Sequence, residues 1–121
     1  FVLRNEADPE GAQFIAPIHQ YDHSVGLSIT GGIHYQGAAL PDLKGAYIYG
    51  DFVIGKIWAL RAADDGKVSS DTLLFTSPQA EAAAPKKKPS VLVKPTAFCA
   101  DKNGELLVLC WNGALYRVAK R

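Results

Sequence analysis

Apolar and polar residues alternate along several short stretches of the chain, and glycine-rich or polar turns separate these stretches. Residues that alternate with a period of two place one set of side chains on each face of a β-strand. Such stretches, or short runs rich in branched and aromatic residues, occur at 27–35, 46–51, 56–61, 72–76, 96–100, 105–110 and 115–118. None of them keeps the 3.6-residue apolar period of a helix, so the sequence predicts an all-β fold.

The second and third of these stretches recur later in the chain. Residues 45–52 (GAYIYGDF) align with 104–111 (GELLVLCW), so that apolar residues coincide at most strand positions and an aromatic residue closes both segments. After a gap of one residue, 55–60 (GKIWAL) align with 113–118 (GALYRV). A repeated strand–turn–strand unit with an antiparallel pattern is typical of the blades of a β-propeller.

The repeat predicts a single unit, over 1–121, of two four-stranded antiparallel blades. The first blade spans 27–76 and the second spans 96–119. A connector, which begins as a low-complexity run of Ala, Pro and Lys, spans 77–95. Because the second blade has only three predicted strands of its own, we expect residues 1–4 to act as a strand that completes a neighbouring blade.

Two blades cannot close a ring, because each would leave a large apolar face in water and stacked repeats need at least about three units. The chain is therefore expected to belong to a longer propeller or to assemble with copies of itself. Three chains of two blades would give a ring of six blades. We favour this homotrimer if the chain is stable by itself.

The composition and charge of the chain argue against some classes of partner. Its 121 residues are 48% hydrophobic and 21% charged, with a formal net charge of +1. This balance is typical of one globular unit and gives no reason to expect nucleic acid or an anionic membrane. No apolar run approaches the roughly 20 residues that span a bilayer, and no signal-peptide pattern opens the sequence. The absence of Met favours a processed chain or a fragment.

The two cysteines, Cys99 and Cys110, lie on adjacent predicted strands around the Asn103-Gly104 turn. A two-residue turn there would pair Cys99 with Val108 and Cys110 with Ala97, which leaves the two thiols diagonal to each other. This geometry disfavours a disulfide between them, which is the alternative to two free thiols. The sequence predicts two free, buried thiols that pack as small hydrophobic residues.

Candidate ligand-binding residues precede the first blade. His19, Tyr21 and His23 lie in a loop before an inner strand, where the mouth of a propeller channel is expected, and Lys94 precedes an inner strand of the second blade. These four side chains could meet a polar ligand there. His19 and His23 with Asp22 could instead hold zinc, but histidines four residues apart converge on a helix, which this stretch does not favour.

Catalytic chemistry finds little support in the sequence. The run Asp22-His23-Ser24 contains the residue types of a hydrolase triad, but consecutive side chains cannot point at one another. Asp51 and Asp101 are expected to have structural roles, because each stands where a strand ends and a turn begins and can bond backbone amides. The sequence thus assigns no catalytic residue and no metal ligand.

Three motifs resemble the glucose/sorbosone dehydrogenase family, in its C-terminal blades. They are SITGGIHYQG (28–37), LPDLKGAYIYGDFVIGKIWAL (40–60) and CADKNGELLVLCWNGALYRV (99–118). The resemblance implies a six-bladed propeller and a periplasmic or secreted location. It also implies a link to sugar oxidation, since many members use pyrroloquinoline quinone (PQQ) with calcium. The same propeller also occurs without evident chemistry.

The family's functional positions match this chain only in small part. The catalytic histidine and the calcium site of the family lie in earlier blades, outside these residues. In the family, the late blades place cationic side chains against the quinone at two positions. In this chain the first position is Val53 or Ile54, and the second is Lys94 and Thr96. We therefore expect a self-assembling propeller module without chemistry or cofactor of its own. The alternative is a part of a PQQ- and calcium-dependent sugar dehydrogenase whose catalytic blades lie outside this chain.

Overall fold

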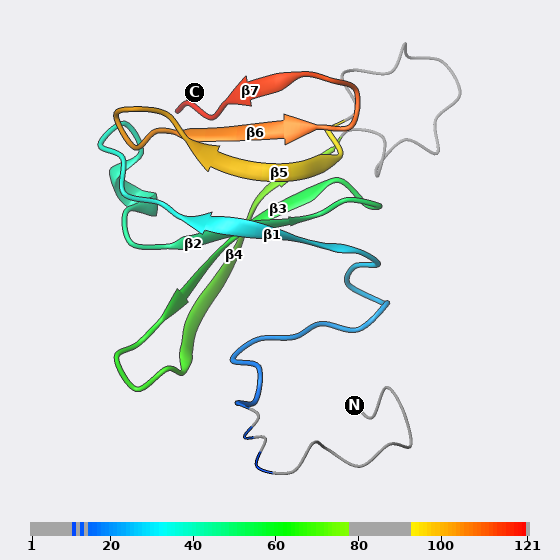
Figure 1. Ribbon diagram of the computed structural model, residues 1–121, viewed down its shortest axis with the longest axis vertical. Coiled ribbons are helices and arrows are strands. Elements are labelled where there is room, and N and C mark those ends of the chain that lie inside the picture. The colour runs from blue at the N-terminus through cyan, green and yellow to red at the C-terminus, as the bar shows by residue number, and fades with distance from the viewer. Residues whose placement is uncertain (1–10, 12, 14, 78–92, 121) are drawn as a thin grey trace.

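The computed structural model describes residues 11, 13, 15–77 and 93–120 (Figure 1). Within them the chain forms β1 (Ile29–His34), a short 3-10 helix η1 (Pro41–Leu43), β2 (Tyr47–Asp51), β3 (Lys56–Ala62), β4 (Val68–Thr76), β5 (Pro95–Ala100), β6 (Leu106–Cys110) and β7 (Leu115–Arg117). The fold of the described residues is all-β, which confirms the fold class that the sequence predicts. Each predicted strand over 27–118 corresponds to an observed one.

The strands form two antiparallel sheets, each in chain order. Sheet A has the order β1-β2-β3-β4, and sheet B has the order β5-β6-β7. The two sheets lie against each other, with β1 and β5 side by side where they meet (Figure 1). The predicted strand at 1–4 and most of the predicted connector at 77–95 lie outside the described residues.

The glycines of β1 allow it to approach its neighbour closely. The pairing of β1 with β2 shifts between Thr30 and Ile33, and Gly31 and Gly32 occupy the shift. A side chain on Gly32 would overlap the backbone carbonyl of Ile48 in β2. Such a β-bulge, or a close approach of two backbones, is what a glycine pair inside a strand indicates.

The main core lies between the two sheets. It is formed by alternate residues of the facing strands together with the loop after β1, and its buried members are Tyr35, Leu40, Ala46, Ile48, Ile57, Ala59, Leu106, Val108 and Cys110. A second, smaller cluster lies on the opposite side of sheet A, where Tyr49, Trp58 and Leu60 are buried beneath the segment 15–28. We call that side the outer face of sheet A.

The aligned repeats share their turn conformation. Gly45 and Gly104, which open the aligned segments, have φ of 79° and 78°, and Gly55 and Gly113 have φ of 65° and 79°. Only glycine adopts this left-handed region without strain. The alignment therefore relates positions with the same backbone geometry, which lets one sheet be compared with the other residue by residue.

The pairing predicted for the two cysteines is wrong, by one residue for Cys99 and by two residues for Cys110, which pairs with Pro95 beyond an irregularity in β5. Val108 pairs with Phe98, and Cys99 pairs with Leu107. The cause is the loop between β5 and β6, which is longer than a two-residue turn: the amide of Asp101 donates to the carbonyl of Glu105 over 3.0 Å. A shift of one residue moves side chains to the other face of a strand. Both thiols are free, as expected, but Cys99 is exposed rather than buried, and only Cys110 lies in the core.

Candidate functional site

Asp51 ends β2 and is completely buried. One carboxylate oxygen accepts hydrogen bonds from the amides of Val53 and Ile54, at 2.8 and 3.0 Å. The other accepts from the amides of Leu27 and Ser28, at 2.6 and 2.7 Å, and also from the Tyr21 hydroxyl, at 2.9 Å. These five donors fix the turn after β2 and hold the segment before β1 against sheet A.

The protonation states of this pair suit a structural contact. Burial opposes ionisation of Asp51, but the hydrogen bonds from Ile54, Ser28, Tyr21 and Leu27 outweigh it, and the pKa of the carboxyl lies below its ordinary value. Burial, together with the bond to Asp51, raises the pKa of the Tyr21 hydroxyl. At neutral pH the carboxylate is therefore charged and the hydroxyl keeps its proton, so neither group is poised for acid–base chemistry.

Four ring side chains form a row along the outer face of sheet A. His19 lies 5.9 Å from Tyr49, Tyr49 stacks on Trp58 at 5.3 Å with an interplanar angle of 14°, and Trp58 lies 5.9 Å from Tyr21, all between ring centroids. Tyr49 and Trp58 come from neighbouring positions of β2 and β3. His19 and Tyr21 come from the segment 15–28, so the row joins that segment to the sheet.

His19 ends this row in a polar contact with β4. Its Nε2 lies 3.3 Å from Asp71 Oδ2 and 3.1 Å from the Tyr49 hydroxyl. That hydroxyl donates to Asp71 over 2.9 Å. Burial, followed by the bond to Asp71, raises the pKa of Tyr49. None of these contacts joins His19 to a Ser or Thr hydroxyl or to a Cys thiol, so the group does not form a nucleophile and its base. It instead holds the segment 15–28 to the sheet at a second point.

Lys94 lies elsewhere, at the end where the β2–β3 and β6–β7 turns meet. Its Nζ is 5.3 Å from the centroid of the Phe52 ring, and Phe52 packs edge-on against Trp111 at 5.7 Å. Phe52 and Trp111 are the aligned aromatic residues of the repeat, and Trp111 is 72% exposed. This group gives sheets A and B a contact at that end.

The four predicted ligand residues do not lie together in the structure. His19 and Tyr21 share the outer face of sheet A, where their polar atoms are bound to Asp71 and Asp51. Lys94 packs on Phe52, and His23 is exposed in the turn before β1. No group of three or more His, Cys, Asp or Glu side chains is placed to hold a metal ion within residues 11, 13, 15–77 and 93–120.

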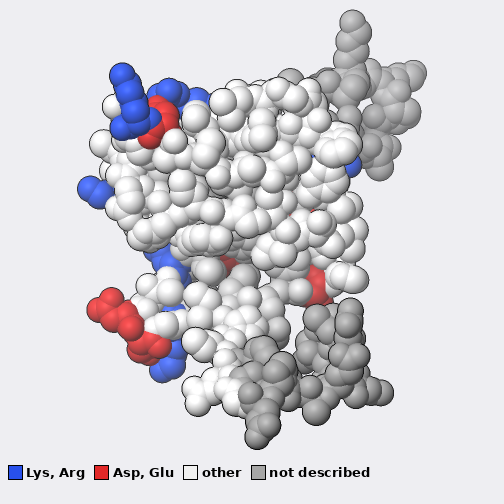
Figure 2. Space-filling view, viewed as in Figure 1, with Lys and Arg blue, Asp and Glu red and all other residues white. Residues whose placement is uncertain are grey.

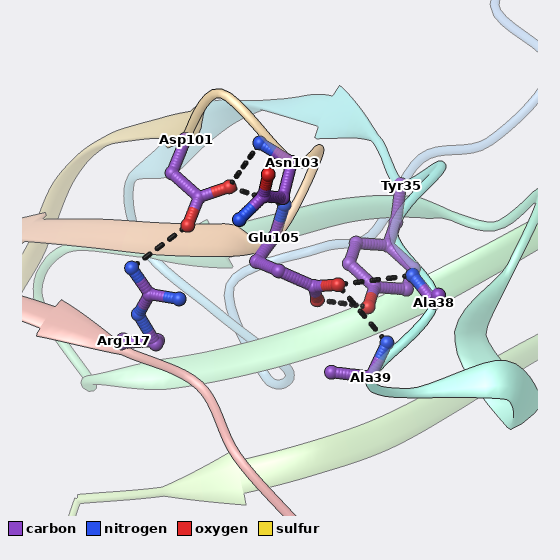
Figure 3. Close-up of polar contacts among 7 residues, drawn as sticks. All are labelled: Tyr35, Ala38, Ala39, Asp101, Asn103, Glu105 and Arg117. Carbon is purple, nitrogen blue, oxygen red and sulfur yellow. Dashed lines mark hydrogen bonds and ion pairs between the residues drawn. The ribbon is translucent and has the colours of Figure 1, made fainter.

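A buried carboxylate that sequence reasoning missed links the two sheets (Figure 3). Glu105, at the start of β6, accepts the Tyr35 hydroxyl at 2.6 Å and the amides of Ala38 and Ala39, both at 3.0 Å. The bonds from Tyr35 and Ala39 lower the pKa of Glu105 against the effect of burial. The alignment contained one signal, because Glu105 coincides with the apolar Ala46 of the first repeat.

Asp101 shapes the loop before β6 (Figure 3). One oxygen accepts from the amides of Asn103 and Glu105, at 2.8 and 3.0 Å, and the other lies 2.8 Å from the Arg117 guanidinium. The amide bonds from Glu105 and Asn103 lower its pKa. Asp101 thus bonds turn amides, the geometry of an Asx turn, and also connects the loop to β7.

The side of sheet B that faces away from sheet A is apolar and uncovered within the described residues. We call it the far face. Its residues are Ala97, Cys99, Leu107, Leu109 and Leu115, together with Arg117, the one charged side chain among them, which is paired with Asp101. Leu109 and Leu115 are 41% and 58% exposed. Figure 2 shows few charged side chains over β5 and β6 on the side of the molecule that it presents. An apolar surface of this kind marks an interaction site more often than a scattered exposed residue does.

The positions that correspond to quinone contacts in the resembling family do not fit that cofactor. The amides of Val53 and Ile54 bond Asp51, and the Thr96 hydroxyl donates to the carbonyl of Leu109 over 3.1 Å. Lys94 is the one cation among these four positions. A quinone carboxylate needs charged donors, preferably in a forked geometry.

No helix in the part of the chain that the structure describes is long and apolar enough to cross a membrane. No family model matches the chain, and no solved structure matches it significantly. The resemblance to the glucose/sorbosone dehydrogenase family therefore depends on the motifs at 28–61 and 96–119, and it stays a prediction.

Proposed function

We propose that the chain is a two-blade module of a β-propeller, which closes a six-bladed ring by assembling with two further copies and has no catalytic chemistry of its own. One observation carries this proposal: two related sheets pack face to face, and the far face of the second is apolar and exposed. A surface of that kind costs free energy in water unless another surface covers it.

The order of the strands supports the comparison with blades. In a propeller, the strands of each blade follow one another outward from the central channel, and neighbouring blades approach at their inner strands. Sheets A and B both have their strands in chain order, and their first strands, β1 and β5, are the ones that lie together. The central channel would then run beside β1 and β5.

Sheet B also has an edge where a further strand would fit. β7 is its last described strand, whereas β3, the aligned strand of sheet A, is followed by β4. A groove of about 680 Å³ lies between β4 and β7, lined by apolar residues that include Phe75, Tyr116 and Val118. We assign residues 1–4 (FVLR) of another copy to the edge of β7, where their apolar side chains would cover this groove.

The alternative function is a contribution to a PQQ- and calcium-dependent sugar dehydrogenase. The resemblance favours it. It needs blades that lie outside this chain. A saturable change in tryptophan fluorescence when the purified chain is titrated with PQQ would favour this alternative, because a module without a quinone site should show none.

The solution mass of the purified chain tests the proposed assembly. Light scattering on a sizing column should give a discrete species near three times 13.0 kDa. A folded monomer at all concentrations would contradict the proposal. An aggregate would also contradict it, and would favour a chain that needs the remaining blades of a longer protein.

A further inference from the structure

We infer that copies of the chain join head to tail, with the far face of sheet B in one copy against the outer face of sheet A in the next. This inference rests on the proposed ring and deepens it, because it names the two surfaces that close the ring. It comes from comparing the faces of the two aligned repeats.

The outer face of sheet A corresponds to a face of sheet B that is already covered. Tyr47 and Tyr49, on the outer face, align with Leu106 and Val108. Leu106 and Val108 lie in the core between the sheets, packed against sheet A. In the second repeat, then, this face receives the preceding sheet. The part of the outer face that the segment 15–28 leaves open, around Ile29 and Tyr47, should receive a preceding sheet, and within an assembly that sheet comes from another copy.

The far face of sheet B corresponds to the face of sheet A that packs against sheet B. Leu107 and Leu109 align with Ile48 and Gly50 of sheet A. Ile48 belongs to the core between the sheets, and a side chain on Gly50 would meet Pro95 of sheet B at 2.8 Å. In the first repeat this face receives the following sheet. If the next copy is placed on sheet B as sheet B is placed on sheet A, it therefore lies on the far face.

One contact within the chain indicates which residues should meet between copies. The Thr30 hydroxyl donates to the carbonyl of Pro95 over 3.0 Å, where β1 and β5 lie together. Through their pairing with aligned positions of β2 and β6, Thr30 corresponds to Ala97, and Ile29 corresponds to Pro95. The counterpart of the Thr30–Pro95 contact is then Ala97 of one copy against Ile29 of the next.

The two surfaces also fit in shape and polarity. A groove of about 500 Å³ lies on the outer face of sheet A and is lined mostly by apolar residues, Ile29 and Tyr47 among them. The segment 15–28 buries Tyr49 and Trp58 but leaves Ile29 and Tyr47 at 61% and 41% exposure. The projecting side chains on the far face of sheet B are apolar except for Arg117, which is paired with Asp101, so neither surface would bury an unpaired charge.

The direction of joining determines the type of assembly. Two different surfaces in contact form a heterologous interface, which generates a ring when the rotation closes. Contact between two identical far faces would form an isologous dimer and leave both grooves open. A head-to-tail contact therefore excludes an isologous dimer and gives the proposed ring when the rotation closes.

Crosslinking of paired cysteine variants tests the inference. In a Cys99→Ser background, Ala97→Cys and Ile29→Cys are made separately and together, because both positions are exposed and lie on the two surfaces. The chains are treated with a short bifunctional maleimide and separated under denaturing conditions. We expect the double variant to give covalent species up to the trimer, and the two single variants to link to each other only when mixed.

The outcomes separate this inference from the proposed ring. A covalent dimer from Ala97→Cys alone would mean that far faces meet each other, and would overturn the head-to-tail inference. A trimeric mass without any link between the two positions would overturn the inference and leave the proposed ring standing. A monomeric mass for the unmodified chain would overturn both.

Discussion

The outward sides of the two sheets differ in what covers them. On sheet A, the segment 15–28 lies over the buried ring pair Tyr49 and Trp58. Two polar ties hold it there, one through Tyr21 and one through His19.

On sheet B, the side that faces away from sheet A is bare within the described residues. Leu109 and Leu115 project from it and are substantially exposed. Apolar residues alternate on both sheets, so the alternation alone does not say which face is covered. The comparison teaches that a sheet of this repeat covers its second apolar face with chain from outside the sheet. For sheet B, we propose that another copy supplies that chain.

A charge on the bare face should have the largest effect. Leu109→Glu with Leu115→Glu would bury two carboxylates in the proposed interface, where desolvation is costly. We expect assembly to weaken by more than about 100-fold, or about 2.7 kcal/mol, measured as the concentration at which the trimer dissociates. Val53→Glu, which charges an exposed apolar position in the turn after β2, is the matched control and should leave the mass unchanged.

Loss of the hydrogen bonds to Asp51 on the outer face of sheet A should have the second-largest effect. Asp51→Ala removes the acceptor for four backbone amides and leaves these part-buried donors unpaired, each of which costs up to about 1–3 kcal/mol. We expect the free energy of unfolding in urea to fall by at least about 3 kcal/mol. Tyr21→Phe removes one hydrogen bond to the same carboxylate and should cost about 1 kcal/mol. Equal losses for the two variants would mean that the amide bonds contribute little.

Acid should produce the smallest effect. The pKa values of Asp51 and Glu105 are lowered in the folded protein, from ordinary values of 3.8 and 4.5. The unfolded chain therefore binds more protons near pH 4. Stability from these groups is fully present above pH 4.5 and is lost as pH falls through the folded pKa values. Urea unfolding between pH 7 and pH 3 measures this loss, and Glu105→Gln should flatten the decline. An unchanged pH profile in that variant would show that Glu105 does not contribute.

The sequence predicted the strands well, because their signals are local. Alternation and glycine turns identify β2, β3, β6 and β7, and the aligned glycines recur with the same positive φ. Asp51 was also a local inference, since it follows a strand and precedes amides that its side chain can reach. Features of this kind need no knowledge of distant residues.

Contacts between distant residues could not be predicted in the same way. Glu105 bonds Tyr35, which lies in the loop after β1, and His19 reaches Asp71 on β4. No periodicity relates such partners. The exposure of Cys99 was missed for another reason, because the Asp101 loop shifts the pairing of β5 and β6 by one residue. A tight-turn assumption was enough to reverse the faces.

The reactivity of Cys99 towards a thiol reagent tests the coverage of the far face most directly. Cys99 lies on that face and is exposed in the single chain, whereas Cys110 is buried and serves as an internal reference. We expect Cys99 to react slowly at concentrations where the trimer forms and quickly after dilution, while Cys110 stays slow throughout. A fast, concentration-independent reaction of Cys99 in the folded chain would contradict the proposal that another copy covers sheet B.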